Sequence, residues 1–355
     1  MRIGILTLQF NNNYGGLLQA YALQSYLKER GHEVYVIQKP FGATLSLEIK
    51  RIIRKLLGRE ASVNSKNMSD FQHNILNETD IAYTTNGIKS IVKKYALDAI
   101  VVGSDQVWRY SEHYNKYKRY FLKFTENMNV KKITFAASFG VDFWEADEKQ
   151  TFIAKEMIRK FDAVSVRERS GIDLCRKYLD YNKAIQLFDP TLLHNADFYR
   201  KLYTGIEIDN SSKIGLFILD SSKQKDILIS NFEKETGKSS FTIGKYQKEG
   251  RCYFPSVQQW LKDFDTADYI ITDSFHGMVF SIIFGKPFCV IGNHQRGLTR
   301  FVSLLNTFGL QDRLIEENVE IVPYGKVLSE PDYSNSQEKI ESNKKSSNEF
   351  LVNCL

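Results

Sequence analysis

Short apolar runs alternate with longer helical patterns along the first part of the chain. Runs at 3–8, 34–37 and 99–102 are each long enough for a strand buried on both faces of a parallel sheet. Between the first two runs, apolar positions from Leu17 onward repeat at helical spacing and end before Gly31, a residue type favoured at helix C-termini. The pattern predicts a βαβ unit with a right-handed crossover.

The same alternation continues to the end of the chain. Further strands are predicted at 133–137, 163–166, 185–188, 214–219, 241–244, 269–272 and 287–291. The weaker stretch 196–212 reads as a domain junction. We therefore predict an α/β fold of two doubly wound, Rossmann-like domains facing across a cleft. Residues 1–200 form the first domain, and residues 201–355 form the second, with a closing C-terminal helix.

Composition excludes several classes of protein. Hydrophobic residues make up 43% and charged residues 25%, which is typical of a globular chain. A formal net charge of +6 over 355 residues does not point to nucleic acid as a partner. The four cysteines and six histidines lack the spacing of disulfide frameworks or metal sites. We expect neither a signal peptide nor a membrane span, and therefore a cytoplasmic protein.

The stretch 47–59 places five apolar residues on one helical stripe, with basic residues elsewhere. This pattern is typical of a helix lying on a membrane surface, which would give peripheral contact at the inner face of the membrane. An ordinary amphipathic helix packed on a sheet has the same stripe, and that interpretation is favoured because such helices are common.

A polar loop with two glycines joins the first strand to the first helix. Its residues are Asn13, Tyr14, Gly15 and Gly16. A helix N-terminus favours an anion, so the loop is either a phosphate or carboxylate cradle or a plain tight turn.

Polar residues follow two other strands of the first domain. Ser104, Asp105 and Trp108 come after the run 99–102, and we predict a substrate-facing loop with an exposed indole rather than a pair of helix caps. Arg167 follows the run 163–166, where it could bind a phosphate or carboxylate. From its immediate context alone, a surface ion pair with the adjacent glutamate is the preferred interpretation.

The segment 272–277 is the richest in chemical groups. Asp273, Ser274 and His276 lie between an apolar strand and an apolar helix. Histidine is the side chain best suited to proton transfer near neutral pH, whereas Asp273 could be only a helix cap. No GxSxG sequence occurs, which argues against an α/β-hydrolase.

Taken in order, these segments resemble the polysaccharide pyruvyl transferase family. The resemblance rests on the motifs at 14–23, 102–108, 137–140, 165–168, 189–191 and 273–277. It implies a fold similar to the GT-B glycosyltransferases. It also implies a reaction in which phosphoenolpyruvate gives a pyruvate ketal on a sugar diol and releases phosphate.

The resemblance also implies roles for individual residues. His276 matches the site histidine of the family, and Arg167 matches an arginine implicated in donor binding. The better-known members have an arginine where this chain has Ser274, so Arg296, Arg300 or Lys245 would have to supply the missing charge. The catalytic candidates are His276 and Asp105. The residues expected to bind substrate are Asn13, Tyr14, Gly15, Gly16, Ser104, Trp108, Ser138, Arg167, Asp273, Ser274, Gly277 and Arg300.

Two other functions compete with the transferase. A GT-B glycosyltransferase would bind a nucleotide sugar, with Asp263 or Asp265 holding the ribose. A non-catalytic sugar-binding protein would tolerate replacement of the predicted site residues. For the transferase, the expected partners are phosphoenolpyruvate and an oligosaccharide or lipid-linked sugar, with no cofactor. The donor anions are expected near the carboxyl ends of both sheets.

We predict that turnover does not require a divalent metal, because the chain offers no spaced set of metal ligands and cationic side chains can meet the donor charge. Phosphate release from phosphoenolpyruvate in the presence of sugar acceptors should therefore be unchanged by EDTA. Loss of turnover in EDTA that magnesium or manganese restores would contradict this prediction.

Overall fold

The computed structural model describes residues 1–10, 12–39, 63–64, 66–113, 117–248, 250–292, 297–319 and 321–355. The stretch 47–59 and Arg296 lie outside these residues. The chain forms two compact units, Met1–Leu193 together with Lys345–Leu355, and His194–Lys344. The division therefore falls at 193/194, close to the predicted junction at 200/201.

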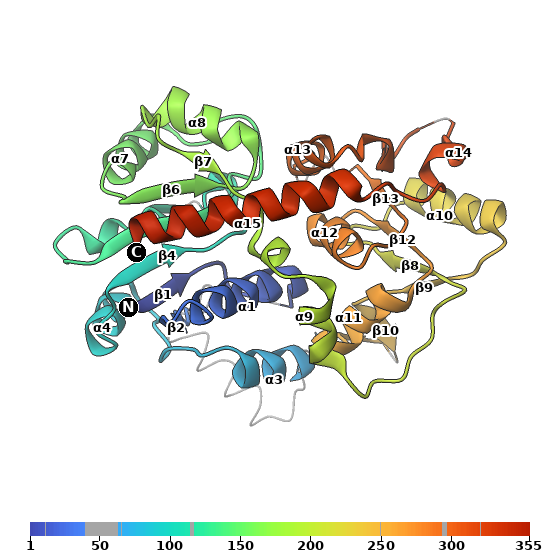
Figure 1. Cartoon of the computed structure of the whole chain (residues 1–355), viewed down its shortest axis with the longest axis horizontal. Coiled ribbons are helices and arrows are strands. Elements are labelled where there is room, and N and C mark those ends of the chain that lie inside the picture. The colour runs from blue at the N-terminus through green and yellow to red at the C-terminus, as the bar shows by residue number, and fades with distance from the viewer. Residues whose placement is uncertain are drawn as a thin grey trace. The chain divides into compact units, whose positions relative to one another are not determined.

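The first unit is built on six parallel strands in the order β2-β1-β4-β5-β6-β7 (Figure 1). The strands are β1 (Arg2–Leu6), β2 (Glu33–Val36), β4 (Ala99–Val102), β5 (Lys131–Ala137), β6 (Ala163–Val166) and β7 (Ile185–Gln186). In register, Ile3 of β1 lies opposite Val34 of β2 on one side and Ala99 of β4 on the other. The short strand β3 (Val63–Asn64) is not part of this sheet.

Helices connect these strands and cover the sheet. They are α1 (Tyr14–Lys28), α3 (Lys66–Ile75), α4 (Thr85–Lys94), α5 (Tyr110–His113), α6 (Tyr117–Tyr120), α7 (Glu148–Ile158) and α8 (Arg169–Leu179). All four residues of β4 are fully buried, as expected for a strand covered on both faces. This burial on both faces explains why the strands are continuous apolar runs in the sequence.

The second unit has five parallel strands in the order β14-β13-β12-β8-β9. The strands are β8 (Ile214–Phe217), β9 (Ser240–Thr242), β12 (Tyr269–Thr272), β13 (Phe288–Ile291) and β14 (Leu314–Ile315), and a separate antiparallel pair is formed by β10 (Tyr246–Lys248) and β11 (Arg251–Tyr253). The helices are α9 (Ala196–Arg200), α10 (Lys223–Thr236), α11 (Val257–Thr266), α12 (Phe275–Ile283), α13 (Thr299–Phe308) and α14 (Tyr324–Val327).

The last helix, α15 (Ser334–Cys354), begins in the second unit and ends in the first. The ring of Phe350 lies 6.5 Å from that of Phe135 in β5, and Lys131 Nζ donates to the carbonyl of Cys354 at 2.9 Å. Leu351 is buried. These contacts place the final turns in the first unit, whereas we predicted that the closing helix belongs to the second.

Most strands of the two parallel sheets lie at the apolar runs from which they were predicted. The predictions at 99–102, 163–166 and 269–272 match β4, β6 and β12 residue for residue. The sequence analysis missed β14, which has only two residues and therefore no apolar run to detect it by. Within the described part of the chain, no helix combines the length and hydropathy needed to cross a membrane.

The start of α12 lies unusually close to the strand that precedes it. A Cβ atom built on Gly277 would be 2.1 Å from Thr272 Oγ1 and 3.0 Å from a ring carbon of Phe217. The hydroxyl of Thr272 cannot easily move away, because it donates to the Phe217 carbonyl at 2.7 Å and accepts from Ser274 N at 3.1 Å. Only glycine fits this position without a shift of the backbone.

We predict that Gly277→Ala lowers the free energy of unfolding by about 1–3 kcal/mol, the usual cost of overpacking. The matched control is Gly325→Ala in α14, where a new Cβ meets no atom within 4 Å. Denaturant unfolding of both variants checks the prediction. Equal midpoints for the two variants would contradict it.

Candidate functional site

The predicted site residues form two groups at the carboxyl ends of parallel strands. One group follows β1, β4, β5 and β6 in the first unit, and the other follows β12 and β13 in the second unit. This is the edge of a parallel sheet at which doubly wound proteins bind their ligands.

A buried ion pair ties three strand ends together in the first unit. Asp189 Oδ2 accepts from Arg167 Nη1 at 2.9 Å and from Ser104 Oγ at 2.8 Å. Its other oxygen accepts from the hydroxyl of Thr191 at 2.8 Å. The side chains of Arg167 and Asp189 are 3% and 0% exposed. Arg167 is therefore an interior cation matched to a carboxylate, rather than the surface partner of Glu168 that its sequence context favoured.

A second carboxylate faces the same guanidinium. Glu168 Oε2 lies 3.8 Å from Arg167 Nε, while Oε1 accepts from Ser138 Oγ at 2.9 Å and from the backbone N–H groups of Phe139 and Gly140. Ser138, which we predicted to bind substrate, thus donates its hydroxyl proton to the protein's own glutamate. One arginine between two carboxylates holds the ends of β5, β6 and β7 in a fixed arrangement.

Asp105 lies at the N-terminus of α1. Its backbone has the left-handed φ of 81°, which is uncommon for a residue with a side chain and is most often adopted by asparagine and aspartate. A Cβ built on Gly16 would be 3.4 Å from Asp105 Oδ2, so the carboxylate lies close to the first turn of the helix. The side chain of Asn13 accepts from Gly16 N at 3.0 Å. The predicted anion cradle at Asn13, Tyr14, Gly15 and Gly16 therefore already faces a carboxylate of the protein.

The indole of Trp108 is buried, so its predicted exposure is wrong. The residue is 1% exposed, and its Nε1 donates to the carbonyl of Tyr120 at 3.1 Å. Its ring stacks on Phe121 at 4.8 Å and packs against Phe139. The aromatic residues around it are far away in the sequence, so the local pattern could not reveal that they bury the indole.

In the second unit, Asp273 is fully occupied by protein donors. Its Oδ1 accepts from Leu219 N at 2.6 Å, and its Oδ2 accepts from Asp220 N at 3.1 Å and from Lys225 Nζ at 2.7 Å. Asp273 is 0% and Lys225 2% exposed. The pair fastens the loop after β8 to the loop after β12, and it leaves no net charge there.

His276 and Ser274 lie beside this pair at the start of α12. They are 7% and 6% exposed, and the side chain of Ser274, the N-cap residue, makes no capping hydrogen bond. Arg300, at the start of α13, places its guanidinium carbon 5.6 Å from the ring centre of Phe275. A histidine, a hydroxyl and an arginine thus belong to the same part of the second unit. Lys245, the other described candidate for the missing charge, is exposed.

Lys225 is a residue that the sequence analysis missed. It belongs to a polar helix, but it shares one helical face with the buried Leu228 and Phe232. A charged residue on an apolar stripe is the signal that could have identified it. Asp189 was noted only as part of a motif, and its partner Arg167 comes from another strand end.

In the described ranges, no group of three or more histidine, cysteine, aspartate or glutamate side chains is arranged to hold a metal ion.

Comparison with known proteins gives a family and a fold. The polysaccharide pyruvyl transferase model matches residues 13–295. No curated protein sequence matches the chain. Among solved structures, the UDP-GlcNAc 2-epimerase of Methanocaldococcus jannaschii in complex with UDP-GlcNAc and UDP is 12% identical, with a TM-score of 0.57 over 99% of this chain and 100% of that one.

A glycosyltransferase from Rickettsia africae is 11% identical, with a TM-score of 0.53 over 98% of this chain and 93% of that one. At such low identity these likenesses show the fold alone, which is that of the GT-B enzymes. The family match covers most of the chain. The protein belongs to the polysaccharide pyruvyl transferase family.

Proposed function

We propose that the protein transfers pyruvate from phosphoenolpyruvate to two hydroxyls of a sugar in a cell-surface polysaccharide or its lipid-linked precursor. Membership of the family supports a transferase of this class. We further propose that the reaction takes place in the cytoplasm, in line with the absence of paired cysteines in the sequence.

The observation that carries the proposal is the chemistry at the start of α12. A helix N-terminus favours a negative charge, and the first-turn N–H groups have no partner within the helix. Ser274 and His276 belong to this turn, and Arg300 adds a cation. The nearby carboxylate of Asp273 does not repel an anion, because Lys225 neutralises it.

The start of α1 differs in this respect. The carboxylate of Asp105 lies against that helix, so a phosphate there would meet a like charge. We therefore assign the phosphate and carboxylate of the donor to the second unit. The Ser274 hydroxyl can donate a hydrogen bond to either anionic group, and Arg300 can supply the charge that Ser274 lacks.

The chemistry needs a proton donor and two attacking hydroxyls. His276, as imidazolium, gives a proton to the methylene carbon of phosphoenolpyruvate while one sugar hydroxyl bonds to the neighbouring carbon. The second sugar hydroxyl then bonds to that carbon and the carbon–oxygen bond to phosphate breaks. The ketal and inorganic phosphate are the products, and the hydroxyl protons pass to His276 and to the released phosphate. Histidine suits both proton transfers.

Asp105 is the second candidate for proton transfer. It is largely buried, and its Oδ1 accepts only from the N–H of the following residue at 2.8 Å among the bonds that the described structure shows. Its left-handed backbone is the kind of local strain that often occurs at functional sites. We propose that it accepts a hydrogen bond from a sugar hydroxyl.

The alternative of a nucleotide-sugar donor is less well supported. Asp265 accepts from Arg200 and from the hydroxyl of Tyr203, and Asp263 accepts from Asn210 and Gln259. Burial also raises the pKa of Asp263 to about 6. Both carboxylates are therefore already committed to partners in the protein, which leaves neither well suited to hold a ribose.

A phosphate-release assay distinguishes the two donors. The purified protein is mixed with phosphoenolpyruvate or with a panel of nucleotide sugars, each with oligosaccharide acceptors. Acceptor-dependent phosphate release and a ketal in the product support the proposal. Glycosyl transfer from a nucleotide sugar, without phosphate release from phosphoenolpyruvate, would replace it with the alternative.

We predict that His276→Ala lowers kcat by about 10²–10⁴-fold, because it removes the group that transfers the proton. The KM for phosphoenolpyruvate should change much less, since the imidazole acts mainly in the transition state. Steady-state kinetics measure both constants, with His32→Ala in the first unit as the control. A wild-type kcat in His276→Ala would reduce the histidine to a structural role.

Arg167 and Arg300 should respond differently to replacement by methionine, which keeps the apolar stem. Arg300→Met should raise the KM for phosphoenolpyruvate about tenfold and leave the fold intact, as expected for loss of a binding cation. Arg167→Met leaves Asp189 buried without its cation, which should cost about 3–5 kcal/mol of stability. Kinetics together with denaturant unfolding test this contrast, and the reverse pattern would exchange the two assignments.

A further inference from the structure

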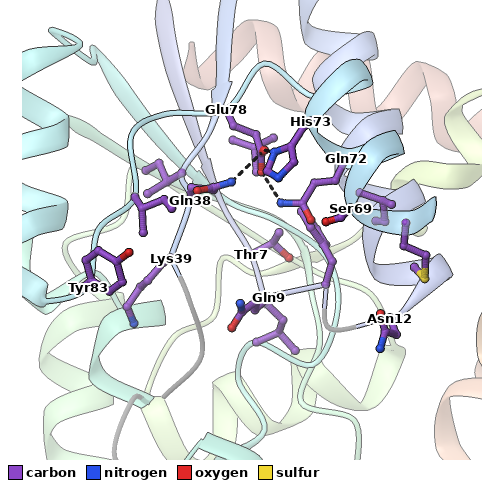
Figure 2. A pocket seen from close by; sticks show the side chains of 17 residues that line it. Thr7, Gln9, Asn12, Gln38, Lys39, Ser69, Gln72, His73, Glu78 and Tyr83 are labelled. Carbon is purple, nitrogen blue, oxygen red and sulfur yellow. Dashed lines mark hydrogen bonds and ion pairs between the residues drawn. The ribbon is translucent and has the colours of Figure 1, made fainter. Parts of the chain in front are cut away.

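A polar pocket of about 350 Å³ lies in the first unit. Its walls come from the segment after β1, the segment after β2, helix α3 and the chain that follows α3 (Figure 2). None of the predicted site residues lines this pocket, although Asn12 and Leu17 in its wall flank the loop at 13–16. The volume is within the lower range of small-molecule sites.

The chemistry of the pocket is organised by Glu78. Its Oε2 accepts from Gln38 Nε2 at 3.0 Å and lies 2.9 Å from His73 Nδ1, while its Oε1 accepts from Gln72 Nε2 at 2.6 Å (Figure 2). The side chain of Glu78 is only 9% exposed. Three donors thus satisfy this carboxylate, so it has little capacity left for a ligand.

Glu78 also determines which groups the neighbouring amides can offer. Because Gln38 and Gln72 turn their Nε2 groups towards Glu78, their Oε1 atoms are turned away from it. Gln9, from the segment after β1, also lines the pocket, and its buried Oε1 has no hydrogen-bond partner among the described residues. These three amides therefore offer acceptor oxygens to a ligand, while Ser69 and Tyr83 add hydroxyl groups that can both donate and accept.

This arrangement favours a neutral ligand rich in hydroxyl groups. Acceptor oxygens need O–H donors, and they repel the oxygens of a phosphate or carboxylate. The charges of Glu78 and Lys39, both on the pocket wall, offset each other. Ile81 and Tyr83 remain 48% and 45% exposed there and offer apolar surface to the C–H face of a sugar ring.

We propose that this pocket binds a neutral sugar ring of the acceptor, with Gln9, Gln38 and Gln72 accepting hydrogen bonds from its hydroxyls. Glu78 is the positioning residue that fixes the direction of two of these amides. The assignment of the sugar as the acceptor rests on the proposed function, whereas sugar binding itself does not. The ligand chemistry is opposite to that at α12, where the groups favour an anion.

Sugar binding can be measured without any donor. Saturation-transfer NMR on the full-length protein, with the methyl glycosides of glucose, galactose and mannose as probes, reports binding directly. We expect at least one glycoside to bind the wild type. Gln9→Ala and Gln72→Ala should each weaken that binding about tenfold, as expected for the loss of one hydrogen bond.

Two comparisons separate binding from folding. Gln9 Oε1 makes no hydrogen bond within the described structure, so Gln9→Ala breaks no internal hydrogen bond of that oxygen. Gln337→Ala in α15, an exposed glutamine of the second unit, is the matched control and should bind like the wild type. Thermal unfolding of each variant verifies that the fold is retained.

The proposal would be overturned if none of the three glycosides bound the wild type. Undiminished binding in folded Gln9→Ala and Gln72→Ala would also overturn it. So would displacement of the bound glycoside from the wild type by inorganic phosphate. Failure of the proposed function would look different. In that case the glycosides would still bind the pocket, but phosphoenolpyruvate would release no phosphate.

Discussion

A carboxylate withdrawn from water must be matched by a cation or by several hydrogen-bond donors, and this constraint shapes both units of the protein. In the first unit, Asp189 and Glu168 share Arg167 and collect hydroxyl and backbone donors from neighbouring strand ends. In the second unit, Asp273 takes two backbone N–H groups and the ammonium of Lys225. Each buried carboxylate therefore holds together loops that are far apart in the sequence.

The same constraint determines which ligands suit the polar groups that are not paired within the protein. Where the protein supplies its own anion, as Asp105 does at α1, a helix N-terminus loses its attraction for a phosphate. Where the anion is neutralised, as at Asp273, the next helix keeps that attraction. In the pocket at Glu78, the amides of Gln38 and Gln72 donate to the carboxylate, and their oxygens remain for a ligand. Pairing within the protein thus determines the chemistry that is left for substrates.

The fold could be predicted from the sequence to a large extent, because strands covered on both faces need continuous apolar runs such as β4 and β12. The environment of individual side chains could not. Whether Trp108 is exposed depends on Phe121 and Phe139, and whether Arg167 faces a ligand depends on Asp189. Such partners meet only after the sheet has formed, so local spacing says little about them. The pocket at Glu78 is a further example, since its amides come from three separate elements.

The path of α15 has a consequence for synthesis on the ribosome. The second unit, His194–Lys344, is one uninterrupted segment, whereas the first unit includes Lys345–Leu355. Domains usually fold from the N-terminus as the chain emerges. Here the first sheet must wait for residues 345–355 before Phe350 can cover β5. The segment translated second can therefore complete its fold first, and the nascent first unit exposes apolar surface of β5 until residues 345–355 have been made.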